Sequence, residues 1–180
     1  GLIMSSICLV LSGTTIKENL EDVKRYKSNI DLIELRADYL VIEEIPYIHT
    51  FPEQVPFPVI LTMRRKQDGG KYVSTEQERS AFFAMALKGK FSYVDFETDF
   101  DNRTLLETVR NKGVTVIRSL HDFDGIPEDP SEVINTLPRN RDEIPKLAAM
   151  PRSSKDLYSL VQACMTLQKK KNIVLGMGPW

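Results

Sequence analysis

The chain has 180 residues, which is enough for one domain with a substantial core. Hydrophobic residues make up 42% of it and charged residues 27%, a composition typical of a globular protein and not of a disordered one. The net charge is -1 and the pI is about 6.2, so the chain lacks the strong basic field of many nucleic-acid-binding proteins. No apolar run approaches the roughly 20 residues that span a bilayer, and we expect no signal peptide.

Apolar runs of strand length alternate with segments of helical character along the whole chain. Strands are expected at residues 6–11, 32–36, 59–64, 93–97, 115–120, 144–148 and 173–177. Helices are expected at residues 15–28, 42–49, 75–87, 102–111, 131–137 and 154–169, and the proline-bearing stretch 51–58 is expected to be a connection. This alternation predicts a parallel α/β sheet, either doubly wound or closed into a barrel, in one domain over residues 1–180.

Charged side chains recur on one side of the expected strands. Alternate strand residues face opposite sides, and in five strands one side is apolar while the other is polar or charged; Arg118 alone interrupts the apolar side. The polar side gathers seven titratable residues near the carboxyl ends of the strands: Glu34, Arg36, Arg64, Asp95, Glu97, His121 and Lys146. Active sites of (β/α) folds form at these ends, so we predict a shared polar pocket. The alternative is a structural network of ion pairs near one rim.

The cysteines and histidines give little sign of a metal site. Cys8 and Cys164 each lie in an apolar stretch, and we expect buried free thiols, as in a reducing cytoplasm. No Cys and His cluster has zinc spacing, and no glycine-rich phosphate loop follows the first strand. His49 is expected at the surface. The sequence therefore predicts no metal, and it argues against a nucleotide-binding protein.

Five segments together resemble the type I 3-dehydroquinate dehydratases. They are LIELRAD at 32–38, LTMR at 61–64, SLHDF at 119–123, IPKLA at 144–148 and GMG at 176–178. The resemblance implies an eight-stranded (β/α) TIM barrel, a lyase that converts 3-dehydroquinate to 3-dehydroshikimate without a cofactor. This reaction belongs to the shikimate pathway of chorismate and aromatic amino-acid biosynthesis.

The same resemblance implies roles for individual residues. Lys146 falls on the Schiff-base lysine, His121 on the acid–base histidine, and Glu34 on the glutamate that orients this histidine. The implied substrate-binding residues are Arg36, Arg64, Asp68 and Met177. Asp68 replaces the usual glutamate with a side chain one methylene shorter. Asp95 and Glu97 are expected to pair with the arginines and fix their direction.

The family's eighth strand, and an arginine, serine and glutamine near its C-terminus, have no counterpart in these 180 residues. We therefore expect a C-terminally incomplete chain that turns over poorly. The expected partner is a small-molecule substrate, without nucleic acid or membrane, and either a homodimer or a fusion to shikimate dehydrogenase is compatible with the family. The expected location is the cytoplasm. Two other functions stay open: a class I Schiff-base aldolase and a non-catalytic barrel fragment.

Overall fold

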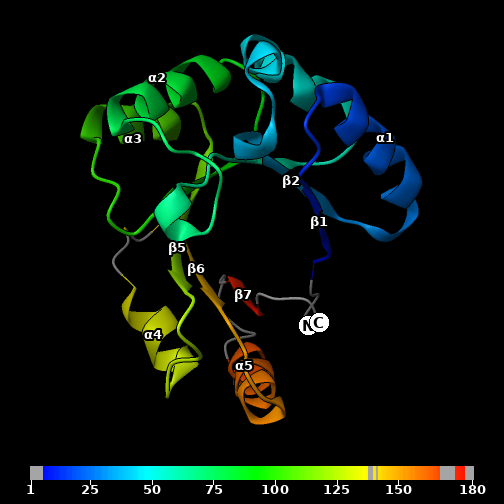
Figure 1. Ribbon diagram of the computed structural model, residues 1–180. Coiled ribbons are helices and arrows are strands. Elements are labelled where there is room, and N and C mark those ends of the chain that lie inside the picture. Colours follow the sequence, from blue (N-terminus) through cyan, green and yellow to red (C-terminus); the bar gives the residue numbers. More distant parts are fainter. Residues whose placement is uncertain (1–5, 138–139, 141, 167–172, 177–180) are drawn as a thin grey trace. The chain divides into compact units, whose positions relative to one another are not determined.

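The structure is a computed structural model that describes residues 6–137, 140, 142–166 and 173–176 (Figure 1). The chain forms two compact units. Of the described residues, the N-terminal unit comprises 6–95 and 101–115, and the C-terminal unit comprises 96–100, 116–137, 140, 142–166 and 173–176. Strands and helical segments follow one another in both units, as the sequence predicts.

The strands of the N-terminal unit are parallel and lie in chain order. They are β1 (Cys8–Leu11), β2 (Leu32–Arg36), β3 (Val59–Thr62) and β4 (Tyr93–Glu97), whose last two residues belong to the C-terminal unit. Val10 lies opposite Glu34, Glu34 lies opposite Ile60, and Leu61 lies opposite Val94. Parallel neighbours need a connection that returns along the sheet, and helical segments supply it here.

The α-helices of the N-terminal unit are α1 (Ile16–Tyr26), α2 (Glu76–Ala86) and α3 (Arg103–Asn111). Each begins after a residue whose side-chain oxygen accepts a hydrogen bond from a backbone N–H of the first turn. These residues are Thr15, Thr75 and Asn102. The predicted end of α3 at residue 111 is confirmed, and Gly113 follows with a φ of 75°, in the left-handed region that favours glycine.

A run of 3-10 turns, η3 (Ile42–Gln54), replaces the short helix and the connection expected here. The predicted boundary near residue 50 is therefore wrong. Pro46 and Pro52 lie inside the run, and a proline cannot donate the hydrogen bond of a regular α-helix. The tighter turns still bury Ile48 and Phe51 completely. Shorter 3-10 segments are η1 (Lys27–Asn29), η2 (Ala37–Tyr39) and η4 (Lys66–Asp68).

The C-terminal unit contains β5 (Thr115–Asp122), which begins in the other unit by one residue, β6 (Ile144–Ala149) and β7 (Ile173–Gly176). These strands pair in parallel and in chain order. Helices α4 (Pro130–Thr136) and α5 (Ser154–Thr166) lie between them in the sequence. Ile134 and Leu137 of the α4 region pack on Leu147 of β6, so the apolar side of β6 faces this helix.

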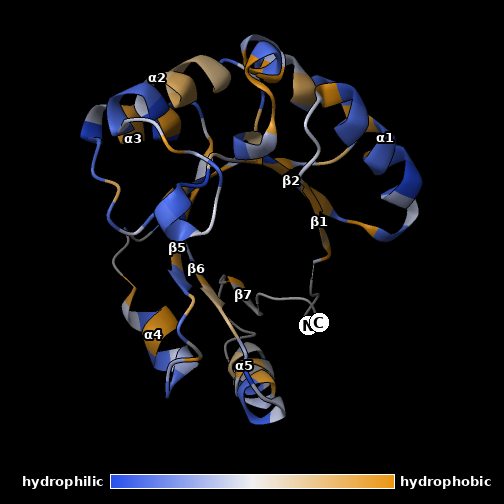
Figure 2. Cartoon of the chain, viewed as in Figure 1, coloured by the Kyte–Doolittle hydropathy of each residue, from blue (hydrophilic) through white to orange (hydrophobic). Residues whose placement is uncertain are grey.

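The apolar side of the N-terminal strands forms the core of that unit. Ile33, Leu35, Leu61 and Val94 have no exposed surface, and β1 and β2 are coloured largely hydrophobic in Figure 2. Cys8 departs from this pattern because its side chain is exposed, so the predicted burial of this thiol is wrong. Cys8 lies on β1, which comes first in the strand order and pairs with β2 among the described strands.

Candidate active site

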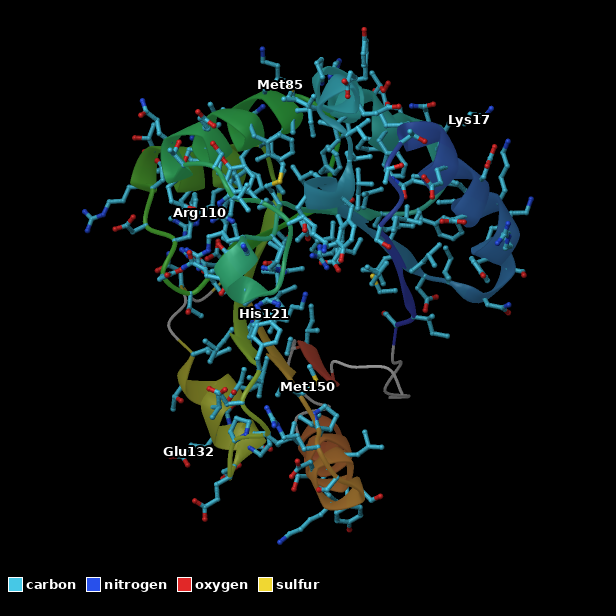
Figure 3. All side chains as sticks on the ribbon, in the orientation of Figure 1. Lys17, Met85, Arg110, His121, Glu132 and Met150 are labelled. Carbon is cyan, nitrogen blue, oxygen red and sulfur yellow. The ribbon has the colours of Figure 1, made fainter. Side chains whose placement is uncertain are left out.

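Lys146 and His121 lie on one face of the β5–β6 pair. Ser119 lies opposite Lys146, and His121 lies opposite Ala148. Opposed residues of a parallel ladder share a face, and so do residues two apart along a strand. The lysine and the histidine are therefore separated by two residues along the strand direction, roughly 7 Å, and by one strand spacing of about 4.8 Å. Figure 3 labels His121 on β5.

Lys146 is buried, with 7% of its surface exposed. Leu147 and Ala149 alternate with it and point to the apolar side, while Ala148, on the lysine's own face, is also buried. The partner across the ladder, Ser119, is 1% exposed. A long cationic side chain is rarely buried unless it is paired or functional, so this lysine is a candidate for chemistry and not for solubility.

His121 is half-buried near the end of β5. Its ring stacks on Phe123, with 6.3 Å between the ring centroids and an angle of 15° between the planes. The adjacent Asp122 accepts a hydrogen bond from the backbone N–H of Asp124 at 3.0 Å, and its carbonyl accepts one from Met150 N–H at 3.0 Å. Asp122 therefore orders the loop after β5. Within the SLHDF segment, the imidazole of His121 is the group suited to proton transfer.

Glu34 and Thr62 meet inside the N-terminal unit. Glu34 is 7% exposed, and its Oε2 accepts a hydrogen bond from the Thr62 hydroxyl at 2.8 Å. Arg36 of β2 lies opposite Thr62 of β3, so the glutamate reaches its neighbour diagonally. The threonine belongs to the LTMR segment, but its link to Glu34 could not be predicted from the sequence because it depends on the register of two strands.

Arg64 and Asp95 form a second buried pair in the same unit. Arg64 Nη1 donates to Asp95 Oδ1 at 2.8 Å, and the side chains are 3% and 0% exposed. The prediction that Asp95 pairs with an arginine is thereby confirmed. A guanidinium held by a carboxylate presents its remaining N–H groups in fixed directions, which suits recognition of carboxylates and hydroxyls.

Arg36 is held by Asp38, a residue for which no role was predicted. The guanidinium donates two hydrogen bonds to the carboxylate, from Nε at 3.0 Å and from Nη2 at 2.8 Å. Asp38 also accepts from the backbone N–H of Lys71 at 3.0 Å, and the Arg36 guanidinium lies 5.1 Å from the centre of the Tyr39 ring. Asp38 thus joins the segments that follow β2 and β3.

Asp68 pairs with its neighbour Arg65, whose Nε donates to it at 2.6 Å. The loop returns along Arg64, because Tyr72 N–H donates to the Arg64 carbonyl at 3.1 Å. Gly70 passes against the same carbonyl so closely that a Cβ atom would clash with it. Partial burial raises the pKa of Tyr72 above its usual value, and a hydrogen bond with Ser74 acts in the opposite direction.

Two predicted site residues remain, Glu97 and Met177. Glu97 is 3% exposed, and its backbone carbonyl accepts a hydrogen bond from Arg118 at 3.0 Å. The expected pairing of its carboxylate with an arginine stays a prediction. Met177 lies outside the described residues.

Among residues 6–137, 140, 142–166 and 173–176, no group of three or more His, Cys, Asp and Glu side chains is arranged to hold a metal ion. Within the same ranges, no helix combines the length and the apolar character needed to cross a membrane.

Parallel strands joined by helical segments, with polar residues near their carboxyl ends, define an α/β protein of the (β/α)-barrel class. A model of the type I 3-dehydroquinase family matches residues 7–180. The chain belongs to this family.

Individual relatives agree with the family match. The 3-dehydroquinate dehydratase of Listeria innocua is 30% identical over 185 residues, which cover 92% of this chain and 71% of the relative. The crystal structure of the Geobacillus kaustophilus 3-dehydroquinate dehydratase superposes with a TM-score of 0.82 over 98% of this chain and 75% of that one, at 23% identity, and so supports the fold. The dehydroquinate dehydratase and shikimate dehydrogenase structure from S. pombe matches 96% of this chain and 36% of its own length, with a TM-score of 0.71 and 21% identity.

Proposed function

We propose that this protein is a hydro-lyase that dehydrates 3-dehydroquinate to 3-dehydroshikimate through a Schiff base on Lys146. Membership of the type I 3-dehydroquinase family supports the reaction. The observation that carries the residue assignment is the β5–β6 register, in which the buried amine and the imidazole share one face. A structural lysine on the solvent side of a strand would have neither this burial nor this neighbour.

The chemistry follows from the two groups. The neutral Lys146 amine attacks the C3 ketone, and loss of one water gives an iminium ion, a better electron sink than the ketone. His121 removes the C2 proton, an enamine forms, and the C1 hydroxyl leaves as water with the proton that His121 returns. Water then hydrolyses the imine and restores the amine. The balance is the loss of one water from the substrate, and acid–base help of this kind contributes about 10²–10⁴-fold.

The other site residues take the roles that the family resemblance implies. Glu34 is proposed to hold the imidazole of His121 in one tautomer, and Arg36 and Arg64 to bind the carboxylate and hydroxyls of the substrate. Asp68 and Met177 are proposed as further substrate contacts. The ion pairs of Arg36 with Asp38 and of Arg64 with Asp95 support these roles, since each fixes the direction of a guanidinium.

The wider setting is proposed on the same ground. We place the activity in the cytoplasm, on a small-molecule substrate, in a single domain over residues 1–180. One arrangement that we propose is a fusion to shikimate dehydrogenase, because the S. pombe structure combines dehydroquinate dehydratase and shikimate dehydrogenase. A homodimer is the other arrangement that we propose.

Trapping the imine tests the assignment. The chain is incubated with 3-dehydroquinate and borohydride, and the modified peptide is identified by mass spectrometry. We expect an adduct on Lys146 that is lost in Lys146→Met and kept in Lys155→Met, since Lys155 is an exposed lysine of α5. An adduct on another lysine would refute the assignment, and no adduct in a folded chain would favour a non-catalytic barrel fragment.

A further inference from the structure

Arg118 and Glu143 form a buried ion pair on the side of the β5–β6 pair opposite Lys146. Arg118 Nε donates to Glu143 Oε2 at 2.5 Å, and the side chains are 7% and 1% exposed. Arg118 lies opposite Pro145 of β6, and Glu143 comes immediately before β6, so the ion pair joins β5 to the start of β6. This partner explains how a charged residue can occupy the apolar side of β5.

Further hydrogen bonds hold both side chains in place. Arg118 Nη1 donates to the carbonyls of Glu97 at 3.0 Å and Phe100 at 2.7 Å. Asn140 Nδ2 donates to Glu143 Oε1 at 3.1 Å. Because the guanidinium is planar and its N–H groups point in fixed directions, it can bind the carboxylate at only one position along the strand.

Pro145 has no N–H, but it does not belong to the residues of β6 that donate to β5. Met150 N–H donates to the Asp122 carbonyl at 3.0 Å, and in a parallel ladder only every second residue of a strand donates to the same neighbour, so the nitrogen of Pro145 points away from β5. A shift of one residue between β5 and β6 would move Lys146 to the side opposite His121, because side chains alternate along a strand. Side chains discriminate between registers, because backbone groups repeat along a strand whereas an ion pair joins two particular residues.

We propose that the Arg118–Glu143 ion pair sets the register of β6 on β5 and thereby keeps Lys146 on the face that carries His121. Arg118 and Glu143 are positioning residues, since they lie on the other face of the strands. Exchanging a buried ion pair for apolar residues often leaves stability unchanged, whereas a shifted register would separate two buried charges. The effect on catalysis rests on the proposed function, while the effect on the register does not.

The test uses Arg118→Met/Glu143→Leu, which replaces the ion pair by apolar side chains of similar size. Acetylation rates of Lys146 and of exposed Lys155 are compared by mass spectrometry under native conditions, which reports the register without any activity. The rate of imine trapping at saturating 3-dehydroquinate is measured on the same samples. Arg79→Met is the control, because Arg79 is also a buried arginine with an ion pair but belongs to the N-terminal unit.

We expect the double variant to acetylate faster at Lys146 and equally fast at Lys155, and to trap the imine ~10- to 100-fold more slowly, since small displacements of reacting groups cost about this much. Arg79→Met should change neither the acetylation rate of Lys146 relative to Lys155 nor the rate of imine trapping. Wild-type labelling of Lys146 in the folded double variant overturns the proposal, even if trapping slows. If the double variant does not fold, Glu143→Gln replaces it, and unchanged labelling there also overturns the proposal. Absence of an adduct in the wild type counts against the proposed function alone, because labelling still reports the register.

Discussion

Removing the carboxylate of Asp95 should strongly destabilise the N-terminal unit. Arg64 and Asp95 are 3% and 0% exposed and 2.8 Å apart, so Asp95→Leu takes a buried carboxylate away from a buried guanidinium. Removing one partner of such a pair costs about 3–5 kcal/mol. For a chain of this length, 1 kcal/mol lowers the melting temperature by about 2–4 °C, so the expected fall is roughly 6–20 °C.

Urea unfolding measured by circular dichroism gives the free energy, with the m-value as a check that unfolding remains two-state. The double variant Arg64→Met/Asp95→Leu should recover part of the loss, because it removes the guanidinium together with the carboxylate. Glu53→Leu is the control: Glu53 pairs with Lys90 at 3.7 Å on the surface, and its loss should cost less than about 1 kcal/mol. An Asp95→Leu protein as stable as the Glu53→Leu protein would refute the electrostatic reasoning.

Three further predictions follow from single contacts. Thr62→Val removes the hydroxyl that donates to Glu34 at 2.8 Å and should lower the free energy of unfolding, measured in urea, by about 1.5–3 kcal/mol. The control Thr104→Val, at an exposed position of α3, should have little effect. Equal effects of the two substitutions would contradict the role of this hydrogen bond. His121→Ala should abolish turnover yet leave borohydride trapping at Lys146 intact, and near-normal turnover would reject His121 as the proton shuttle. The pKa of Tyr72 is raised in the folded chain, so its contribution to stability is complete below pH ~10 and is lost as the pH rises further. Tyr72→Phe should therefore reduce the alkaline fall in unfolding free energy, and an identical fall in both proteins would show that Tyr72 does not contribute.

Most of the strands and several of the site residues could be predicted from the alternation of apolar and polar side chains in the sequence. It placed Glu34, Arg64 and Asp95 on the polar sides of their strands, and the structure buries all of them. It also put His121 and Lys146 on one face, as the β5–β6 register does. Alternation succeeds here because each strand is buried on its apolar side, so one residue of error would expose the whole apolar set.

What the sequence missed depends on contacts between distant or irregular segments. Glu143, the partner of Arg118, lies 25 residues away in the chain and just before a strand, where no periodicity applies. Asp38 and Arg65 are charged residues next to site residues, and nothing in their spacing distinguishes a structural ion pair from a substrate contact. The extent of η3 was missed because prolines signal the loss of an α-helix but not what replaces it.

The chain offers its own control for a direct view of the site, since it contains two histidines, His121 and the exposed His49 of η3. Their imidazole NMR signals can be compared before and after borohydride fixes 3-dehydroquinate on Lys146. If amine and imidazole serve one substrate, the signals of His121 shift and those of His49 stay in place. A fully reduced adduct on Lys146 that leaves the His121 signals unmoved would contradict the shared site.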